Sequence, residues 1–281
     1  MNAIGNDEQR CHPELVEGRL SLSRSLSSIF EKRKCAFIPY LMAGDPDIDT
    51  TRDLIRAVTD AGADAIELGV PYGDPLADGP TIAAAGVRAL RGGTRIADVL
   101  QLVRDTASSA PPIVLFTYFN PVYRYGIDRF ARDAANAGAS GAIVPDIALE
   151  EGQALREVLE AHGLDMPLLV APSTSRERAA RIAQVSTGFV YVVSRLGVTG
   201  AADAPDFSPL HGQVAMLRKL TDKPLAVGFG ISRPEHVREV RSLVDGVIVG
   251  SALIDAYAGT RGDAAAKRVR EFLAPLASCT L

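Results

Sequence analysis

The sequence predicts a single α/β domain folded as a (β/α)8 TIM barrel over residues 25–281. Eight short apolar runs alternate along the chain with longer helical patterns. The runs are continuously apolar, which is typical of parallel strands that are buried on both faces. Eight such units in about 245 residues match the usual size of this barrel.

The eight apolar runs are the expected strands, and they span 36–41, 65–69, 113–118, 141–145, 167–171, 189–194, 225–229 and 246–250. The stretches between them are amphipathic. In 50–62, for example, Leu54, Ile55, Val58 and Ala61 fall on one helical face. Several of these stretches end in glycine, as helices often do. The expected helices are 50–62, 126–138, 150–163, 175–186 and 234–244.

An open, doubly wound sheet is the alternative architecture. No G-x-G-x-x-G motif follows the first strand, which counts against it. The chain has 281 residues, of which 47% are hydrophobic and 23% charged, so it can bury a sizeable core. The net charge of −4 gives no general attraction to nucleic acid or to an anionic membrane. No apolar run has the length of a membrane span.

Three cysteines without a C-x-x-C motif indicate reduced thiols and a cytoplasmic location. The four histidines show no metal-ligand spacing, so we expect no metal site. Residues 1–24 carry charges throughout and show no secretory signal, and we interpret them as a mobile or loosely docked N-terminal extension. A first helix that closes the barrel floor fits the sequence better from Ser25 onward.

Glycine-rich loops follow the sixth, seventh and eighth strands, at 195–205, 228–232 and 250–257. On this face of a barrel, glycines let backbone N–H groups approach an anion, so the pattern predicts a phosphate site. The candidates are Gly200, Gly230, Gly250 and Ser251. Tight turns alone would also explain single glycines. The loop at 195–205 is either a lid over a ligand or an ordinary surface loop.

Glu67 lies at the top of the expected strand 65–69, between Ile66 and Leu68, and no Lys or Arg lies near it in the sequence. A charged residue is rarely buried unless it is paired or functional, so we expect Glu67 to face the mouth of the barrel. Asp74 precedes a proline and fits a turn. Asp78 precedes a helical pattern and fits a helix N-cap. The loop between them can also fold Asp78 across the mouth toward Glu67, and two such carboxylates suit paired proton transfers.

Three stretches give the sequence a strong resemblance to a known family. ELGVPYGDPLADGPTI (67–82), FIPYLMAGDP (37–46) and SRLGVTG (194–200) resemble the tryptophan synthase alpha subunit family, and the resemblance runs from about Ser25 to the C-terminus. It implies a lyase that cleaves indole-3-glycerol phosphate to indole and glyceraldehyde 3-phosphate in the last steps of L-tryptophan biosynthesis. It implies neither a metal nor an organic cofactor.

The resemblance also implies site residues. Glu67 would protonate the indole C3 and take a proton from the glycerol hydroxyl, and Asp78 would accept a hydrogen bond from the indole N–H. Tyr40, Tyr118 and Phe229 would be walls of the indole slot, with Phe116 and Ile143 behind them, although core packing fits Phe116 better. Tyr191 would contact the glycerol phosphate, the segments 228–232 and 250–253 would hold the phosphate, and Thr199 would meet the Asp74 loop on closure.

Two positions depart from the family pattern: Gly73 stands where serine is usual, and Leu196 replaces a residue that is more often small and polar. Both changes bear on loop closure. The family implies a pyridoxal-phosphate beta subunit as partner, in an α2β2 assembly.

Three alternatives stay open on the sequence. They are a freestanding lyase, another phosphate-binding barrel enzyme, and a catalytically inactive barrel that activates a partner. No lysine ends an expected strand, which disfavours a Schiff-base aldolase.

Overall fold

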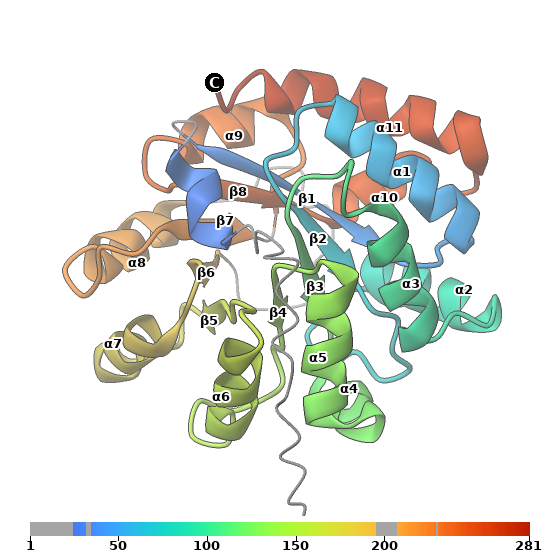
Figure 1. Ribbon diagram of the computed structural model, residues 1–281. Coiled ribbons are helices and arrows are strands. Elements are labelled where there is room, and N and C mark those ends of the chain that lie inside the picture. The colour runs from blue at the N-terminus through green and yellow to red at the C-terminus, as the bar shows by residue number, and fades with distance from the viewer. Residues whose placement is uncertain (1–24, 32–34, 195–206, 229) are drawn as a thin grey trace, which may run out of the picture.

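The computed structural model describes residues 25–31, 35–194, 207–228 and 230–281, and Figure 1 shows a parallel barrel surrounded by helices. The order of the strands is β4-β3-β2-β1-β8-β7-β6-β5, and every pairing is parallel. This arrangement confirms the predicted (β/α)8 fold. The strands are β1 (Ala36–Met42), β2 (Ile66–Gly69), β3 (Ile113–Phe116), β4 (Gly141–Ile143), β5 (Leu168–Val170), β6 (Val190–Val193), β7 (Leu225–Gly228) and β8 (Gly246–Val249).

The helices form the outer ring, and the α1 and α11 helices pack side by side (Figure 1). A short 3-10 helix, η1, precedes the first strand, as the pattern after Ser25 predicts. The helical elements are η1 (Leu26–Glu31), α1 (Ile48–Asp60), α2 (Pro80–Arg91), α3 (Ile96–Thr106), α4 (Phe119–Tyr125), α5 (Ile127–Ala137), α6 (Gln153–Ala161), α7 (Arg176–Val185), α8 (Ser208–Leu217), α9 (Pro234–Val240), α10 (Ser251–Tyr257) and α11 (Gly262–Ala277).

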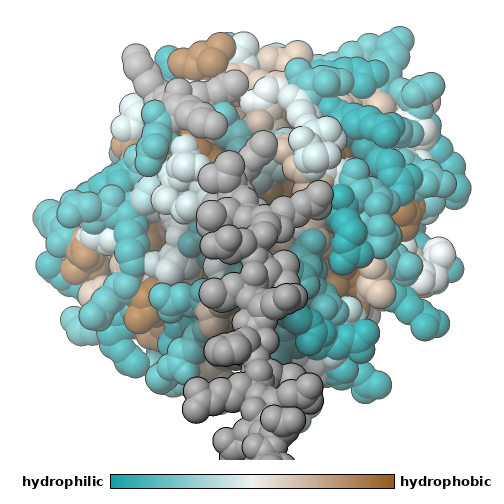
Figure 2. Space-filling view, viewed as in Figure 1, coloured by the Kyte–Doolittle hydropathy of each residue, from teal (hydrophilic) through white to brown (hydrophobic). Residues whose placement is uncertain are grey.

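Each strand is buried along nearly its whole length, because the barrel interior covers one face and the helices cover the other. The outer helices present a mostly hydrophilic surface, on which apolar side chains form small separate areas (Figure 2). Within the described ranges, no helix is long and apolar enough to cross a membrane.

The barrel closes between β4 and β5 through the backbone of Asp165. Its N–H donates to the Ser140 carbonyl at 3.0 Å, and its own carbonyl accepts from the Ala142 N–H at 2.9 Å. A Cβ at Gly141 would overlap that carbonyl, so this close approach needs glycine. The Asp165 side chain also accepts from the Leu26 N–H at 2.9 Å, which ties η1 to the barrel floor.

Two further aspartates act in the same way, and each lies just before one strand and bonds the strand beside it. Asp64 accepts from the Phe37 N–H at 2.9 Å, and Asp245 accepts from the Leu225 N–H at 2.7 Å. Each carboxylate satisfies a backbone donor in the first residues of a strand. These bonds fix the floor of the barrel, so the opposite end is free to carry the site.

Candidate functional site

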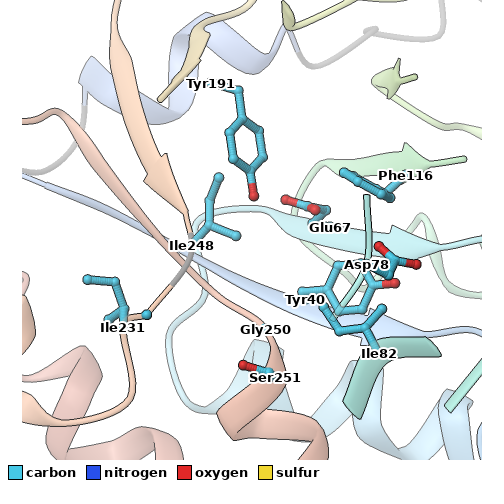
Figure 3. A pocket seen from close by; sticks show the side chains of 11 residues that line it. Tyr40, Glu67, Asp78, Ile82, Phe116, Tyr191, Ile231, Ile248, Gly250 and Ser251 are labelled. Carbon is cyan, nitrogen blue, oxygen red and sulfur yellow. The ribbon is translucent and has the colours of Figure 1, made fainter. Parts of the chain in front are cut away.

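A pocket opens at the carboxyl ends of the strands (Figure 3). Five strands contribute a side chain to it, and the loops and helices that follow the strands contribute the rest. Its lining residues are Tyr40, Glu67, Asp78, Ile82, Phe116, Tyr191, Gly230, Ile231, Ile248, Gly250 and Ser251. This is the end of the barrel that the sequence predicts for the site.

Glu67 lies in the interior of β2, paired across the sheet with Tyr40 of β1 and Val114 of β3. Its side chain lines the pocket, although the residue is only 2% exposed. Burial raises the pKa of Glu67 to about 8, and the charge of Asp78 adds to the increase. Its Oε2 has no hydrogen-bond partner in the part of the chain that the structure describes. The group is therefore a proton-bearing acid near neutral pH that faces an open pocket.

Asp78 comes from the loop between β2 and α2. Two tight turns bring it back over the mouth: the Leu76 N–H donates to the Asp74 carbonyl at 3.0 Å, and the Asp78 N–H donates to the Pro75 carbonyl at 3.1 Å. The N-cap of α2 is Gly79, so the reading of Asp78 as a helix cap is wrong. Its side chain lines the pocket instead.

Burial raises the pKa of Asp78 to about 6, and a hydrogen bond with Tyr118 opposes that increase. Tyr118 follows β3 and does not line the pocket. Its hydroxyl accepts a hydrogen bond from the N–H of Ala77 at 3.0 Å. Ala77 directly precedes Asp78 in the chain. Its ring packs on Tyr72 with the centroids 5.3 Å apart. Tyr118 thus positions the loop of residues 70–79, which carries Asp74 and Asp78 and is called the acidic loop below. The sequence instead predicts that Tyr118 forms a wall of the pocket.

Two tyrosines reach across glycines of the next strand to form the pocket floor. Tyr40 of β1 lies over Gly69 of β2, and Tyr191 of β6 lies over Gly228 of β7, so that a Cβ at either glycine would overlap the tyrosine hydroxyl. Both tyrosines are buried and both line the pocket. The two glycines therefore have a steric role in the site that does not depend on an unusual backbone angle.

The predicted phosphate end is formed by Gly230, Gly250 and Ser251, which all line the pocket. Gly230 has a φ of +93°, which a side chain would strain. His236 of α9 braces this loop: its Nδ1 accepts from the Ser232 N–H at 3.3 Å, and the Gly230 carbonyl hydrogen-bonds the ring. The sequence alone does not point to His236, because only its position four residues after Ser232 on a helix could have suggested the contact.

Some predicted site residues lie elsewhere. Asp74 is exposed on the loop above the pocket and does not line it, and Ile143 is buried behind the lining. Thr199, Gly200 and Phe229, together with Leu196 and the 1–24 extension, lie outside the described residues. Gly73, which stands in the same loop as Asp74, is exposed, and a Cβ there would meet nothing within 4 Å.

Phe116 corrects one expectation, because it lines the pocket rather than serving only as core packing. Its ring contacts Tyr40 edge to face, with the centroids 6.0 Å apart. Three apolar lining residues, Ile82, Ile231 and Ile248, are not predicted from the sequence. Each looks like an ordinary core residue in the sequence, and only the closed barrel shows which side faces the pocket.

The arrangement joins an apolar slot, two carboxyl groups and a glycine-rich end in one cavity. Near neutral pH Glu67 holds a proton while Asp78 is ionised, which suits an acid and an electrostatic partner acting together. Among the described residues, no group of three or more His, Cys, Asp and Glu side chains could hold a metal ion. The chemistry that this chain's residues offer is proton transfer beside an aromatic group.

Comparison with known proteins gives a consistent result. The family model described as tryptophan synthase alpha chain matches residues 26–278. The tryptophan synthase alpha chain of Synechococcus elongatus is 49% identical over 237 residues, which cover 84% of this chain and 89% of that protein. The same chain from a Picosynechococcus species is 47% identical, covering 90% and 96%.

Solved structures agree with the sequence matches. A tryptophan synthase structure from Mycobacterium tuberculosis is similar with a TM-score of 0.84 and 39% identity, covering 91% of this chain and 97% of that one. The tryptophan synthase subunit alpha from Legionella pneumophila has a TM-score of 0.81 and 33% identity, covering 94% and 99%. The chain therefore belongs to the tryptophan synthase alpha chain family, whose reaction is the lyase cleavage of indole-3-glycerol phosphate in tryptophan biosynthesis.

Proposed function

We propose that the pocket at the carboxyl ends of the strands is the site of this retro-aldol cleavage and that Glu67 and Asp78 carry it. The observation that supports the proposal is the difference between the two carboxyl groups. Both border one cavity, yet burial and their mutual repulsion raise the pKa of Glu67 to about 8 and burial raises that of Asp78 to about 6. One acid is then protonated and one ionised at neutral pH, as the reaction requires.

Glu67 acts first as an acid. It gives its proton to C3 of the indole ring, which converts the ring into an electron-accepting indolenine-like cation. The bond between C3 and the hydroxyl-bearing glycerol carbon then breaks, and its electron pair returns to the ring to give indole. The hydroxyl loses its proton to the Glu67 carboxylate and becomes the aldehyde of glyceraldehyde 3-phosphate, so the acid is regenerated.

Asp78 stabilises the charge that develops during this step. Protonation at C3 places positive charge on the ring nitrogen, and an ionised carboxylate that accepts a hydrogen bond from the ring N–H lowers the energy of that state. In this proposal Tyr40 and Phe116 form aromatic walls of the indole slot, and Tyr191 contacts the glycerol phosphate. Phe229, which lies outside the described residues, is a further candidate for the wall.

The substrate phosphate goes to the glycine-rich end of the pocket. Its ligands in this proposal are backbone N–H groups at Gly230 and Gly250 and the Ser251 hydroxyl, with Gly200 adding a further N–H. Thr199 and Asp74 serve loop closure. The φ of +93° at Gly230 supports this assignment, because that backbone angle favours glycine, which has no side chain to block an anion from the backbone.

The test is indole release from indole-3-glycerol phosphate by wild type, Glu67→Gln and Asp78→Asn. Loss of a general acid costs about 10² to 10⁴ in rate, so we expect kcat to fall at least a hundredfold in Glu67→Gln. We expect a comparable fall in Asp78→Asn. Glu157→Gln, on the exposed surface of α6, is the matched control and keeps the wild-type rate. Retained activity in either pocket variant would overturn the assignment.

We further propose that the chain works with a tryptophan synthase beta chain in an α2β2 assembly and is stimulated by it. Two exposed apolar side chains at the pocket end support a partner surface there. Leu76, in the acidic loop, is 80% exposed, and Tyr123 of α4 is 66% exposed. Tyr72 and Asn120 hydrogen-bond at 3.1 Å, which joins the two segments. Adding beta chain should raise indole release at least about threefold, worth about 0.6 kcal/mol, and a smaller rise would contradict the proposal.

A further inference from the structure

The barrel wall has a seam between β4 and β5, the two strands at the ends of the sheet order. Within the described ranges, each other pair of neighbouring strands forms a parallel ladder, whereas β4 and the chain before β5 meet in one isolated bridge, Gly141 to Asp165, at the barrel floor. Outside the seam, α6 packs against α5, and α7 packs against α8. The seam is therefore the least closed part of the wall.

A second cavity lies along this seam, toward the carboxyl ends of the two strands, and we call it the seam cavity. Its volume is about 270 Å³, close to the lower end of the range for small-molecule sites, roughly 300–1,000 Å³. It shares no described lining residue with the pocket that holds the two carboxyl groups. The lining residues on which the inference depends are Val144, Leu169, Ile182, Val193, Arg156 and Arg178.

Two apolar strand residues are open to the seam cavity. Leu169 of β5 and Val193 of β6 both line it, and they are the only residues of the eight strands that are not fully buried. Covering apolar surface that is now in contact with water is favourable. The cavity therefore offers a binding surface to an apolar group.

Two arginines line the same cavity, and none of its described lining residues is acidic. Arg156 of α6 is half-buried, and its Nη1 donates to the Leu149 carbonyl at 2.9 Å, so its other N–H groups remain for a ligand. Arg178 of α7 donates to both carboxylate oxygens of Glu150, at 3.0 and 3.1 Å. Glu150 also pairs with Arg181 at 3.1 Å, so one carboxylate is shared by two guanidinium groups. The cavity therefore combines apolar walls with an excess of positive charge.

We propose that the seam cavity is a second ligand site, which binds a small anion with an apolar body, such as a monocarboxylate with a short hydrocarbon chain. The hydrocarbon covers Leu169 and Val193. The carboxylate accepts hydrogen bonds from Arg156, whose planar guanidinium suits two parallel bonds to one carboxylate. Arg178 stays on Glu150 and adds to the positive potential. This inference does not rest on the proposed function, because no step of the cleavage uses these residues.

The test is a titration of the full chain, carbon-13 labelled at its Ile, Leu and Val methyl groups, with hexanoate. The methyl signals of Leu169 and Val193, identified by their absence in Leu169→Met and Val193→Ala, should shift, and those of Ile82 and Ile248 in the first pocket should not. We expect a Kd on the order of 1 mM, because so small a ligand makes few contacts.

Two further ligands separate the contributions of the two ends of the probe. Acetate lacks the hydrocarbon body, and 1-hexanol lacks the charge, so each should bind at least about tenfold more weakly than hexanoate. Added salt should weaken the binding of hexanoate and leave that of 1-hexanol unchanged, since only the first depends on charge.

Arg156→Met removes the charge and keeps an apolar side chain. It should weaken hexanoate at least about tenfold and leave 1-hexanol within about twofold of wild type. Arg181→Met is the matched control, because it removes an arginine that pairs with the same Glu150 but does not line the cavity. It should keep the wild-type affinity for both ligands.

Four outcomes would overturn the inference. They are unshifted Leu169 and Val193 signals in the wild type, shifts confined to Ile82 and Ile248, equal affinities for hexanoate and 1-hexanol, and equal losses in Arg156→Met and Arg181→Met. The second outcome would place the ligand in the first pocket, and the fourth would reduce the effect to general surface charge. The first three come from the wild-type chain, so they hold even where a variant fails to fold. None of them bears on the cleavage reaction, which indole release tests separately.

Discussion

Replacing Tyr118 with phenylalanine should change the pH dependence of the reaction on one side only. The reactive form has Glu67 protonated and Asp78 ionised, so kcat/KM should follow a bell with its acid limb at about pH 6 and its alkaline limb at about pH 8. The hydrogen bond with Tyr118 holds the pKa of Asp78 down. Its loss raises that pKa, and therefore moves the acid limb upward.

The size of the effect follows from one hydrogen bond to a carboxylate. Such a bond contributes about 1.5 kcal/mol or more, and a pKa change of one unit corresponds to about 1.4 kcal/mol. We therefore expect the pKa of the half-buried Asp78 to rise by about one unit in Tyr118→Phe. At pH 6, half of the wild-type molecules hold the reactive form, and about one in eleven would in Tyr118→Phe. The variant should therefore be about fivefold slower than wild type at pH 6 through protonation alone, and nearly equal at pH 8.

The assay is indole release under kcat/KM conditions from pH 5 to pH 9, in buffers of constant ionic strength. Tyr118→Phe also removes the acceptor of the Ala77 N–H, which can lower the rate by a factor that does not depend on pH. The two effects are separated by comparing kcat/KM of the variant with kcat/KM of wild type at each pH. The ratio at pH 6 is divided by the ratio at pH 8. A quotient near one would refute the assignment of the acid limb to Asp78.

Three further substitutions test the pocket and the barrel that supports it. Gly228→Ala should push Tyr191 out of the pocket floor and lower kcat/KM at least about tenfold, at a cost of about 1–3 kcal/mol in unfolding free energy; an unchanged rate in the indole assay would contradict the steric role. Arg88→Met removes the ion pair that joins Arg88 to the buried Asp45 at 2.7 Å. Urea unfolding should show a fall of about 3 kcal/mol in the free energy of unfolding, and a fall below about 1 kcal/mol would contradict a stabilising role for this pair. Gly141→Ala places a methyl group against the Asp165 carbonyl that closes the barrel. The urea midpoint should fall by the equivalent of about 3 kcal/mol in unfolding free energy. A midpoint equal to that of wild type would contradict this steric requirement.

The strands could be predicted because burial on both faces leaves a direct mark in the sequence. AFIPYL and GVIVG are apolar without alternation, and both form strands within a residue of the expected ends. The closure of the barrel left no such mark. It depends on the backbone of Asp165, which lies three residues before β5 and reads as a loop residue. The bridge between Gly141 and Asp165 is made by backbone atoms of residues 24 positions apart. Such a contact cannot be predicted from a pattern of side chains in the sequence.

The two carboxyl groups could be singled out because an acid in an apolar run is costly unless something requires it. Their division of labour could not, since it depends on burial and on the distance between them in the folded chain. Asp78 shows the limit well: its sequence context fits a helix cap, but the chain turns twice before α2 and Gly79 takes that position. Phe116 likewise reads as core packing and proves to line the pocket.

The most direct test of the acid role of Glu67 is a measurement of the protonation of its carboxyl group. Carbon-13 NMR of the chain labelled at the glutamate carboxyl carbon, with the Glu67 signal identified by its absence in Glu67→Gln, follows this one group as pH rises. In the wild type we expect a titration centred at about pH 8, because burial and the charge of Asp78 both disfavour the carboxylate. In Asp78→Asn, where that charge is gone, we expect a lower midpoint. A wild-type midpoint near 4.5, the ordinary value for a glutamate, would contradict the acid role, because Glu67 would then have no proton to give at neutral pH.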